Sequence, residues 1–302
     1  MNILLLGADG QVGQELNQTL QPLGTVVTWG RQQLDLARLD SIQPAILEQA
    51  PDIIVNAAAY TAVDRAERES ERAYTINGKA PGEMARSATA LGATLIHIST
   101  DYVFAGDAST PYHPTSNPAP LGEYGRSKLA GEEAVRALCD RHCIVRTAWV
   151  YGAKGAGNFV KTMLRLGRER TELRVVADQV GSPTWSADLA RALASSIPLL
   201  HSRSPELSSA QSPYGTYHYT NSGVASWYDF AVAIFEEAAQ FSDLAIERVI
   251  PIATADYPTP ARRPHYSVLD TGTMSQLLGH TPPHWRHSLR SMLSELLASE
   301  TE

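Results

Sequence analysis

The chain has little cysteine and no long apolar run. Its two cysteines, Cys139 and Cys143, lie four residues apart in what we expect to be the end of a helix, and neither has a His or Cys neighbour at zinc-ligand spacing. This favours two reduced cytosolic thiols. The start of the chain, Met1 to Gly7, has neither the basic region nor the cleavage site of a secretion signal, and no stretch reaches the roughly 18 apolar residues of a membrane helix. We therefore expect a cytoplasmic protein that has no membrane partner.

The chain also has no excess of basic residues. The 302 residues include 25 Lys and Arg against 32 Asp and Glu, which gives a net charge of −7. Such a balance argues against a nucleic-acid partner, because that kind of binding depends on neutralising many phosphates. Any phosphate that the chain binds must be met by a local site. The length and the hydrophobic content of 43% allow a sizeable core, in one large domain or two smaller ones.

The first half of the chain alternates apolar runs of strand length with amphipathic stretches of helix length. This alternation predicts the α/β class, with a Rossmann-type doubly wound parallel sheet covered by helices. Strands that are buried on both faces read as continuous Val, Ile and Leu. Such runs occupy Ile3–Leu6, Thr25–Trp29, Ile53–Val55, Thr94–Ile98 and Cys143–Thr147. We expect the helices between them to begin near Val12, Ser41, Glu71 and Arg126.

Two proline-containing segments interrupt this pattern. Residues 201–215 (HSRSPELSSAQSPYG) are polar and rich in Ser and Pro, which predicts a surface loop or an insertion between elements. Residues 109–121 form a second Pro-rich stretch, which either lies over a substrate or is a passive connector. No internal repeat is found in the sequence.

The first expected strand leads into a glycine-rich turn, GADGQVG from Gly7 to Gly13, and then into a helix. Gly7, Gly10 and Gly13 allow a tight turn and a close approach of the backbone to a pyrophosphate, while the N-terminus of the helix offers free N–H groups to the anion. Three glycines at this spacing also occur in ordinary strand-loop-helix turns. The position directly after a buried strand at the start of the chain favours dinucleotide binding.

The end of the second expected strand bears on the choice of cofactor. No acidic residue stands where an NAD-specific domain holds the ribose hydroxyls, and Arg31 occupies this region instead. Its planar guanidinium can pair with a 2′-phosphate, so NADPH is favoured over NADH, although a surface Arg without a ligand is the alternative. Asp35 and Leu36 follow at the place where an acidic side chain can meet the adenine amino group.

Tyr124 and Lys128 are four residues apart in an expected helix, which places both side chains on one face. A reductase must give a proton to the oxygen of the carbonyl that it reduces, and we expect a neighbouring ammonium group to make the phenol a better acid near neutrality. Lys128 can also hydrogen-bond the nicotinamide ribose. Taken alone, the spacing is more often that of an exposed helical pair.

Two further strand ends strengthen this interpretation. The strand that precedes Tyr102 delivers Ser99, Thr100 and Asp101 to its carboxyl end, where ligands bind in open parallel sheets. Thr100 can polarise a substrate carbonyl and position Tyr124, although these hydroxyls could also only cap a turn. The segment Asn56–Asp64 is another strand end, with small residues that allow either the approach of a ligand or tight packing of a helix on the sheet.

Several longer motifs resemble those of the extended short-chain dehydrogenase/reductase superfamily and, within it, of the dTDP-4-dehydrorhamnose reductases. They span nearly the whole chain: GADGQVG at Gly7, NAAAYTAVDRAE at Asn56, STDYVF at Ser99, YGRSKLAGE at Tyr124, VRTAWVYG at Val145, DQVGSPT at Asp178 and ARRPHYSVLD at Ala261. The resemblance implies a reductase of the C4 keto group of dTDP-4-dehydro-L-rhamnose, which makes dTDP-L-rhamnose for cell-surface polysaccharide. It implies an NAD(P)-binding domain over residues 1–150, and over residues 151–302 a mainly substrate-binding lobe with some segments that return to the first domain.

The resemblance also assigns residues to roles. Thr100, Tyr124 and Lys128 become the catalytic triad. Cofactor contacts fall on Gly10, Gln11 and Val12 at the pyrophosphate, Asp35 and Leu36 at the adenine, and Ala59, Tyr60 and Thr61 at the middle of the cofactor. Sugar contacts fall on Thr100, Asp101 and Trp149, whose indole suits the apolar face of a deoxysugar or a place in the core. Contacts to the thymidine diphosphate fall on Asn158, Gln179, Arg262 and Arg263.

Some members of the family dimerise through a magnesium ion held by carboxylates. Glu15 and Glu295 stand at matching places, but the third place holds Ala187, with Asp188 beside it. We therefore expect no metal, and a homodimer stays open. Two other functions remain as alternatives: another extended nucleotide-sugar reductase or epimerase, and a non-catalytic NADP-binding regulatory subunit. The STDYVF and RRPHYSVLD blocks favour the rhamnose reductase over another sugar enzyme, and the presence of the whole triad favours an enzyme.

Overall fold

The computed structural model describes residues 1–201 and 212–298, so residues 202–211 of the predicted Ser/Pro-rich loop lie outside the described residues. The first half of the chain alternates strands and helices. Its elements are β1 (Asn2–Leu6), α1 (Gln11–Thr19), β2 (Thr25–Trp29), α2 (Leu39–Gln49), β3 (Ile53–Asn56), α3 (Val63–Ala66), α4 (Ser70–Tyr74), α5 (Ala80–Leu91), β4 (Thr94–Thr100), α6 (Glu123–Leu138) and β5 (His142–Thr147). Short helices of other types are η1 (Gln21–Leu23), η2 (Thr75–Lys79) and η3 (Asp101–Val103).

The main sheet has six strands, all parallel, in the order β10-β5-β4-β3-β1-β2, where β10 is Gly215–His218. The chain steps from β1 outward to β2 and then crosses to β3 on the other side of β1. The carboxyl ends of β1 and β3 therefore form the switch point at which such sheets bind their ligands. This topology confirms the predicted doubly wound parallel sheet.

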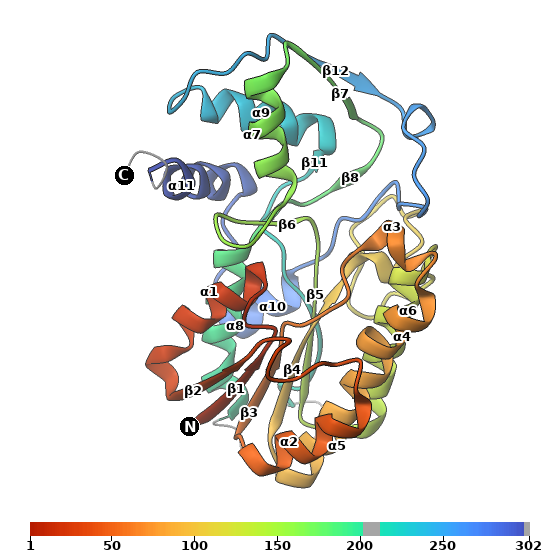
Figure 1. The fold of residues 1–302 in the computed structure, drawn as a ribbon, viewed down its shortest axis with the longest axis vertical. Helices are drawn as coiled ribbons and strands as arrows, with labels where there is room; N and C mark the ends of the chain where they lie inside the picture. Colours follow the sequence, from red (N-terminus) through yellow and green to blue (C-terminus); the bar gives the residue numbers. More distant parts are fainter. Residues whose placement is uncertain (202–211, 299–302) are drawn as a thin grey trace.

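Helices cover both faces of this sheet (Figure 1). Along β1 the side chains alternate, so that Ile3 and Leu5 join one buried cluster, and Leu4 and Leu6 join another. The first cluster contains residues of α1, of α8 (Ser186–His201) and of α10 (Gly272–Leu278), and the second contains residues of α2, α5 and α6. Three elements from beyond residue 151 (α8, β10 and α10) thus complete the sheet and its helical cover.

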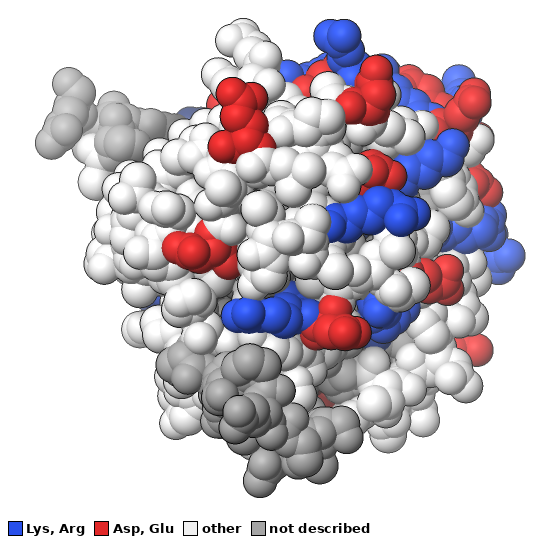
Figure 2. All heavy atoms as spheres, turned by 90° about the horizontal axis from the view of Figure 1, so that it is seen from below, with Lys and Arg blue, Asp and Glu red and all other residues white. Residues whose placement is uncertain are grey.

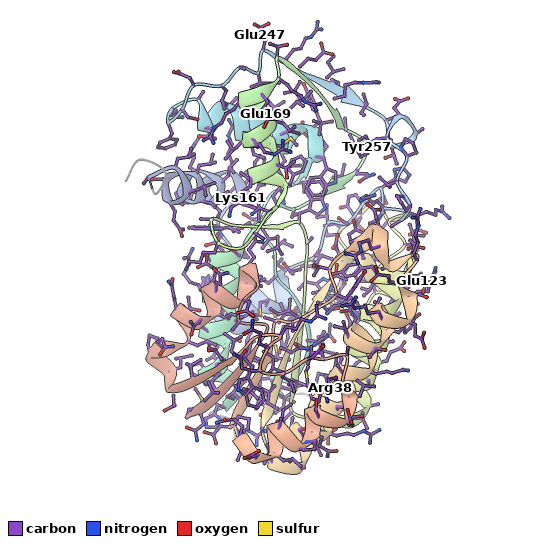
Figure 3. All side chains as sticks on the ribbon, viewed as in Figure 1. Arg38, Glu123, Lys161, Glu169, Glu247 and Tyr257 are labelled. Carbon is purple, nitrogen blue, oxygen red and sulfur yellow. The ribbon has the colours of Figure 1, made fainter. Side chains whose placement is uncertain are left out.

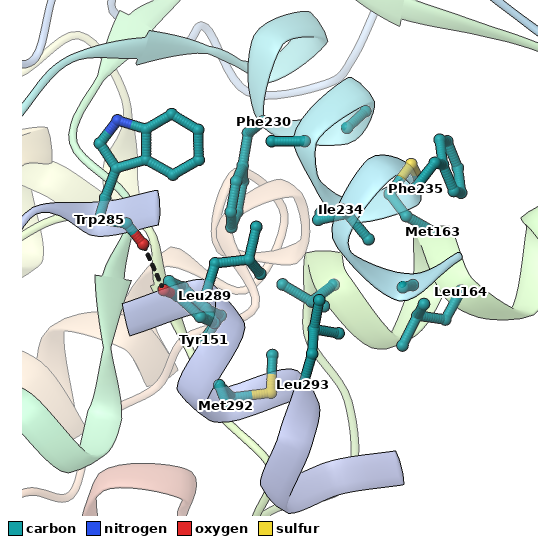
Figure 4. Packing of buried hydrophobic residues seen from close by; sticks show 14 of the residues in the cluster. Tyr151, Met163, Leu164, Phe230, Ile234, Phe235, Trp285, Leu289, Met292 and Leu293 are labelled. Atoms are coloured by element: carbon teal, nitrogen blue, oxygen red, sulfur yellow. Dashed lines mark hydrogen bonds between the residues drawn. The ribbon is translucent and has the colours of Figure 1, made fainter. Parts of the chain in front are cut away.

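The remaining elements form a smaller part with its own core, in the upper half of Figure 1. They are β6 (Val150–Tyr151), α7 (Phe159–Glu169), β7 (Glu172–Val176), β8 (Val180–Gly181), β9 (Thr184–Trp185), β11 (Ala225–Ser226), α9 (Trp227–Ala238), β12 (Arg248–Ile252), η5 (Thr254–Asp256) and α11 (Trp285–Ala298). Figure 4 shows Phe230 and Ile234 of α9 packed against Leu289 and Leu293 of α11. In the same cluster the hydroxyl of Tyr151 donates to the carbonyl of Trp285 at 3.3 Å.

The predicted strands of the first half are confirmed, and each observed strand includes the predicted range. The helices begin at Gln11, Leu39, Ser70 and Glu123, a little before the predicted starts. Cys139 is the C-cap residue of α6, but Cys143 lies within β5, so the expectation that both cysteines end a helix is wrong for Cys143. A strand there follows from the apolar run that Cys143 opens. Both thiols are free and buried.

The elements and the surface show three further features. No helix in the described part of the chain is long and apolar enough to span a membrane. Figure 2 views the lower end of the molecule, where acidic and basic side chains lie next to each other. Figure 3 shows Glu123 at the start of α6 and Tyr257, in the segment after β12, on the same side of the molecule.

Candidate active site

Three strands bring small or polar residues to the carboxyl edge of the sheet. β1 ends at Leu6 before the glycine-rich turn, β3 ends at Asn56, and β4 ends at Thr100. These strands are neighbours, and they are parallel. The carboxyl ends of parallel strands meet at one edge, so the turn and both polar segments gather at the switch point.

In the turn after β1, backbone segments lie in close contact with one another. Gly7 has a φ of +79°, and a Cβ at this position would lie 2.6 Å from the amide nitrogen of Ala58. A Cβ on Gly13 would lie 2.0 Å from the carbonyl oxygen of Gly7. The N-cap residue of α1 is Gly10, which supplies no side-chain acceptor to the first turn of the helix. The N–H groups of that turn are thus free for an anion, and the cradle fits the pyrophosphate of a dinucleotide.

The end of β2 lies against this turn. Two amides of the turn donate to the carbonyl of Trp29, at 2.9 and 3.3 Å. Beyond β2 the side chains of Arg31 and Asp35 come within 3.8 Å of each other and are 70% and 34% exposed. Leu36 is buried. The guanidinium that the sequence assigns to a 2′-phosphate is therefore accessible at the surface, with only a weak surface ion pair to hold it.

The segment Ala59–Thr61 is held by a residue that the sequence analysis did not single out. Asn77, in the π-helical turn η2, accepts from the amide of Tyr60 at 2.8 Å and donates to its carbonyl at 3.0 Å. The side chain of Asn77 also donates to Ser127 of α6, at 3.0 Å. The phenol of Tyr60 donates to Glu69, at 3.0 Å. This arrangement fixes the backbone at the end of β3 relative to the helix that carries Tyr124.

Tyr124 lies at the start of α6 and is half-buried. Burial raises the pKa of Tyr124 to about 12; a hydrogen bond with Thr100 opposes the rise, and the charge of Asp101 adds to it. The ring also meets Tyr102 edge to face, with centroids 5.4 Å apart. The sequence correctly predicts that Thr100 and Tyr124 meet. The phenol is however a weaker acid than we expected, because the loss of hydration outweighs the hydrogen bond with Thr100.

Lys128 is buried and points to the strands. Its ammonium donates to the carbonyl of Ile98 at 2.7 Å and lies 3.5 Å from Nε2 of His97. The other ring nitrogen of His97 contacts the side-chain amide of Asn56 at 2.9 Å. Burial lowers the pKa of Lys128 to about 8, although the charge of Glu132 opposes the shift, and burial together with Lys128 holds the pKa of His97 far below its usual value. Lys128, which the sequence analysis expects to make Tyr124 a better acid, is thus held on β4 by its hydrogen bond to Ile98.

A buried ion pair between α6 and β5 stabilises the ends of the neighbouring strands. Arg146 of β5 makes a two-pronged contact to Glu132 of α6, at 2.9 and 2.7 Å, and Ser99 donates to the same carboxylate at 2.6 Å. Burial alone would raise the pKa of Glu132, but the hydrogen bonds and charge of Arg146 hold it below its usual value. Arg146 also donates to the carbonyl of Pro114 at 3.1 Å. The Pro-rich stretch 109–121 is thus anchored to the sheet.

Asp101 offers an unused acceptor at the site. Its Oδ1 accepts from the hydroxyl of Thr100 at 3.0 Å, while its Oδ2 is buried and has no hydrogen-bond partner among the residues that the structure describes. Burial raises the pKa of Asp101 to about 6, and the hydrogen bond from Thr100 opposes this rise. A buried acceptor without a partner is costly, and a donor on a ligand would satisfy it.

Trp149 follows β5 in a strained backbone conformation, with a φ of +51°. Its indole stacks on that of Trp227 at the start of α9, with centroids 3.6 Å apart and planes inclined by 6°. One face of Trp149 is therefore taken by another aromatic ring. Strain of this kind is frequent at ligand sites. Trp227 is a further site candidate that no motif in the sequence pointed to.

Asn158 and Gln179 have partners within the protein. Asn158 is the N-cap residue of α7, accepts from the amide of Lys161 at 3.1 Å, and donates to Gln11 at 2.7 Å and to the carbonyl of Gly152 at 2.8 Å. Gln179 donates to the hydroxyl of Thr254 at 3.1 Å. The bond from Asn158 to Gln11 joins the smaller part of the molecule to the first residue of α1.

The two arginines of the late motif differ in their surroundings. Arg262 is exposed, whereas Arg263 is part-buried and pairs with Asp64, its NH2 lying 3.0 Å from Oδ2. The NH1 group of Arg263 is buried and has no hydrogen-bond partner within residues 1–201 and 212–298. Of the two, Arg263 thus carries a buried donor that an anionic acceptor would satisfy.

The carboxylates considered for a metal lie apart from any cluster. Glu15 pairs with Lys154 at 3.0 Å, and Glu295 is exposed on α11. Asp188 accepts from Ser288 and from Asn221, at 2.5 and 2.7 Å. Within residues 1–201 and 212–298 no group of three or more His, Cys, Asp or Glu side chains could hold a metal ion.

Comparison with known proteins gives consistent matches over the full length. A family model described as the RmlD substrate binding domain matches residues 1–298. The dTDP-4-dehydrorhamnose reductase of Escherichia coli (strain K12) is 43% identical over 304 residues, which cover 99% of this chain and 99% of that protein. The protein of the same name from Burkholderia thailandensis is 41% identical over 301 residues, 99% of this chain and 100% of that one.

Solved structures agree with this. A dTDP-4-dehydrorhamnose reductase from Clostridium acetobutylicum superposes with a TM-score of 0.89 and 39% identity, covering 98% of this chain and 99% of that one. The Bacillus anthracis reductase, in complex with NADP, superposes with a TM-score of 0.87 and 40% identity, covering 97% and 99%. A UDP-glucose 4-epimerase from Thermus thermophilus shares the fold at 18% identity, with a TM-score of 0.78.

Proposed function

The chain belongs to the RmlD substrate binding domain family, which includes the dTDP-4-dehydrorhamnose reductases, and we propose that it reduces the C4 keto group of dTDP-4-dehydro-L-rhamnose to give dTDP-L-rhamnose. The observation that carries this function is the meeting of Thr100 and Tyr124, beside Lys128, at the sheet edge that also holds the glycine-rich turn. The reaction is a step in nucleotide-sugar biosynthesis for cell-surface polysaccharide.

NADPH is the proposed cofactor, with NADH as a second one. When bound, its nicotinamide supplies the hydride that reduces C4. The free N–H groups at Gln11 and Val12 meet the pyrophosphate, and Arg31 meets the 2′-phosphate. Asp35 and Leu36 lie at the adenine, Ala59–Thr61 at the middle of the cofactor, and Lys128 at the nicotinamide ribose. The tight glycine cradle is what makes these residues fit a dinucleotide.

Tyr124 gives the proton to the C4 oxygen. Because its pKa is raised to about 12, the phenol is protonated near neutral pH and can act as the donor. Thr100 turns the hydroxyl proton that it gives to Asp101 toward the same oxygen, which stabilises the negative charge that develops there. Lys128 is mostly an ammonium ion near neutral pH, since its pKa is about 8, and its charge favours the transfer of the proton away from Tyr124.

The substrate lies between the sheet edge and the smaller part of the molecule. The unpartnered Oδ2 of Asp101 accepts from a sugar hydroxyl, and Trp149, backed by Trp227, contacts the apolar face of the deoxysugar. Arg263 meets the diphosphate through its unpartnered NH1, with Arg262 near the rim. Asn158 and Gln179 are proposed to contact the thymidine diphosphate. To do so, they must give up hydrogen bonds that they make within the protein.

One assay tests the reaction and separates it from the alternatives. The purified chain is supplied with dTDP-4-dehydro-L-rhamnose and either NADPH or NADH, and loss of reduced cofactor and formation of dTDP-L-rhamnose are followed together. We expect both to proceed in equal amounts. Tight cofactor binding without turnover would favour a regulatory subunit, and conversion of a nucleotide sugar without net use of the cofactor would favour an epimerase.

The proposal also covers the cellular compartment and the oligomeric state of the enzyme. The two free, buried thiols are compatible with a reducing compartment, and we propose that the enzyme is cytoplasmic. A homodimer is the proposed assembly, and light scattering of the purified chain measures it directly. The chain is expected to turn over without added magnesium, so treatment with a chelator should leave the rate unchanged.

A further inference from the structure

Asp9, the third residue of the glycine-rich turn, carries an exposed carboxylate. No hydrogen bond or ion pair to this side chain is found among the described residues 1–201 and 212–298. A Cβ on Gly30 would lie 1.9 Å from Oδ2 of Asp9. The carboxylate therefore occupies the space directly above Gly30, where a side chain at that position would begin.

Gly30 is the first residue after β2, and this place decides the choice of cofactor in dinucleotide-binding domains. An acidic side chain there accepts from the 2′-hydroxyl of the adenosine ribose in NAD, whereas a nearby Arg accommodates the 2′-phosphate of NADP. In this chain the strand end itself has no acid. Asp9 supplies a carboxylate to the same place from the neighbouring turn, and Arg31 follows directly after Gly30.

We propose that Asp9 is a specificity-determining residue that opposes Arg31 in the choice of cofactor. Its carboxylate accepts from the 2′-hydroxyl of NADH and repels the 2′-phosphate of NADPH, so that it narrows the preference for NADPH that Arg31 gives. The inference rests on the proposed function, because it takes the glycine-rich turn as the cofactor site. Both charges are exposed, so water and salt screen the repulsion to an effect of several fold.

The test is a titration of the purified protein with NADH and with NADPH, read by fluorescence of the reduced nicotinamide and independent of turnover. In Asp9→Asn we expect NADPH to bind about fivefold more tightly and NADH about threefold more weakly. Arg31→Ala should shift the ratio of the two affinities in the opposite direction. The gain for NADPH in Asp9→Asn should shrink at high salt.

Asp140→Asn is the matched control, since it removes the same charge from an exposed aspartate between α6 and β5, at the opposite edge of the sheet. It should leave both dissociation constants unchanged. An equal shift of both cofactors in Asp9→Asn, or no shift, overturns the role of Asp9 while the proposed function stands. Failure of the unmodified chain to bind either cofactor overturns the proposed function together with this inference.

Discussion

At the scale of single residues, Tyr124 is placed to donate a proton and is ill suited to accept one at neutral pH. Removing its hydroxyl in Tyr124→Phe keeps the ring that packs on Tyr102. We expect turnover to fall by about 10²- to 10⁴-fold, the usual contribution of a positioned acid. Affinity for NADPH should stay nearly the same. Steady-state kinetics and a cofactor titration on the same preparation measure both effects.

Tyr102 offers the control for this variant. It is the neighbouring tyrosine, with its ring centroid 5.4 Å from that of Tyr124, and burial raises the pKa of its phenol as well. Tyr102→Phe removes the same hydroxyl from the same surroundings, but from a residue with no proposed part in proton transfer. Its turnover should stay within a few fold of the unmodified chain. Equal losses in the two variants would refute the role of Tyr124.

Asp101 is a residue whose place in the site costs stability. Its pKa is raised from 3.8 to about 6 by burial, so the folded chain binds this proton more tightly than the unfolded chain does. The free energy of unfolding therefore falls as pH rises from about 4 to about 6. Asp101→Asn removes this penalty, and we expect the variant to be more stable by about 2–3 kcal/mol at neutral pH. The difference should vanish below about pH 4, and substrate should bind more weakly at every pH.

Urea unfolding of Asp101→Asn and of the unmodified chain across this pH range measures the effect. Comparing the two at each pH cancels the other groups that titrate in acid. A stability difference that does not change with pH would show that Asp101 is not the titrating group. A gain in stability together with weaker substrate binding is common when a residue of a functional site is replaced.

The sequence named Thr100, Tyr124 and Lys128, because each stands at a recognisable strand end or helical spacing. It did not name Asn77, which holds Tyr60 from 17 residues away through a π-helical turn. Nor did it name Trp227, whose partner Trp149 comes from an element far away in the chain. Such partnerships depend on how elements pack, and local periodicity carries no signal for them.

At the scale of elements, the Glu132–Arg146 pair joins α6 to β5 and to the Pro-rich stretch. Both side chains are almost fully buried, at 0% and 2% exposure. Glu132→Gln leaves the guanidinium of Arg146 buried without a counter-charge, and we expect a loss of about 3–5 kcal/mol in the free energy of unfolding. Chemical denaturation measures this loss.

A second variant and a control sharpen this prediction. Replacing both partners, Glu132→Met with Arg146→Met, removes the stranded charge and should recover more than half of the stability. The exposed pair Arg165–Glu169, with side chains 61% and 52% exposed, is the control. Glu169→Gln there should cost less than about 1 kcal/mol. A similar small loss for Glu132→Gln would contradict the assignment of a buried, uncompensated charge.

The elements of the first half could be predicted from sequence because buried parallel strands read as unbroken apolar runs. The end of β3 shows the limit of this reasoning. The predicted strand stops at Val55, whereas the observed strand includes the polar Asn56, which pairs with His97 of β4. The helix expected from Glu71 proved to be α4, η2 and α5 in succession. From Val150 onward the strands β6, β8, β9 and β11 have two residues each, too few for any periodicity to appear.

At the scale of the whole molecule, polar contacts join the two parts. Arg263 of the returning segment pairs with Asp64 after β3, and Lys154 pairs with Glu15 of α1. Asn158 donates to Gln11 at the head of α1, where the pyrophosphate is proposed to bind. The smaller part of the molecule thus contacts the glycine-rich turn directly, and we expect this contact to couple its position to cofactor binding.

This coupling can be measured with two helix caps. Asn158→Ala removes the N-cap of α7 together with the bond to Gln11, whereas Ser226→Ala removes the N-cap of α9, which has no part in the turn. Each should cost about 1 kcal/mol of stability. Only Asn158→Ala should also weaken NADPH, by about three- to tenfold, since Gln11 loses a hydrogen bond that orders the first turn of α1. Calorimetric titration of both variants gives the comparison. The same NADPH affinity in both would mean that the contact between the two parts does not reach the cofactor turn.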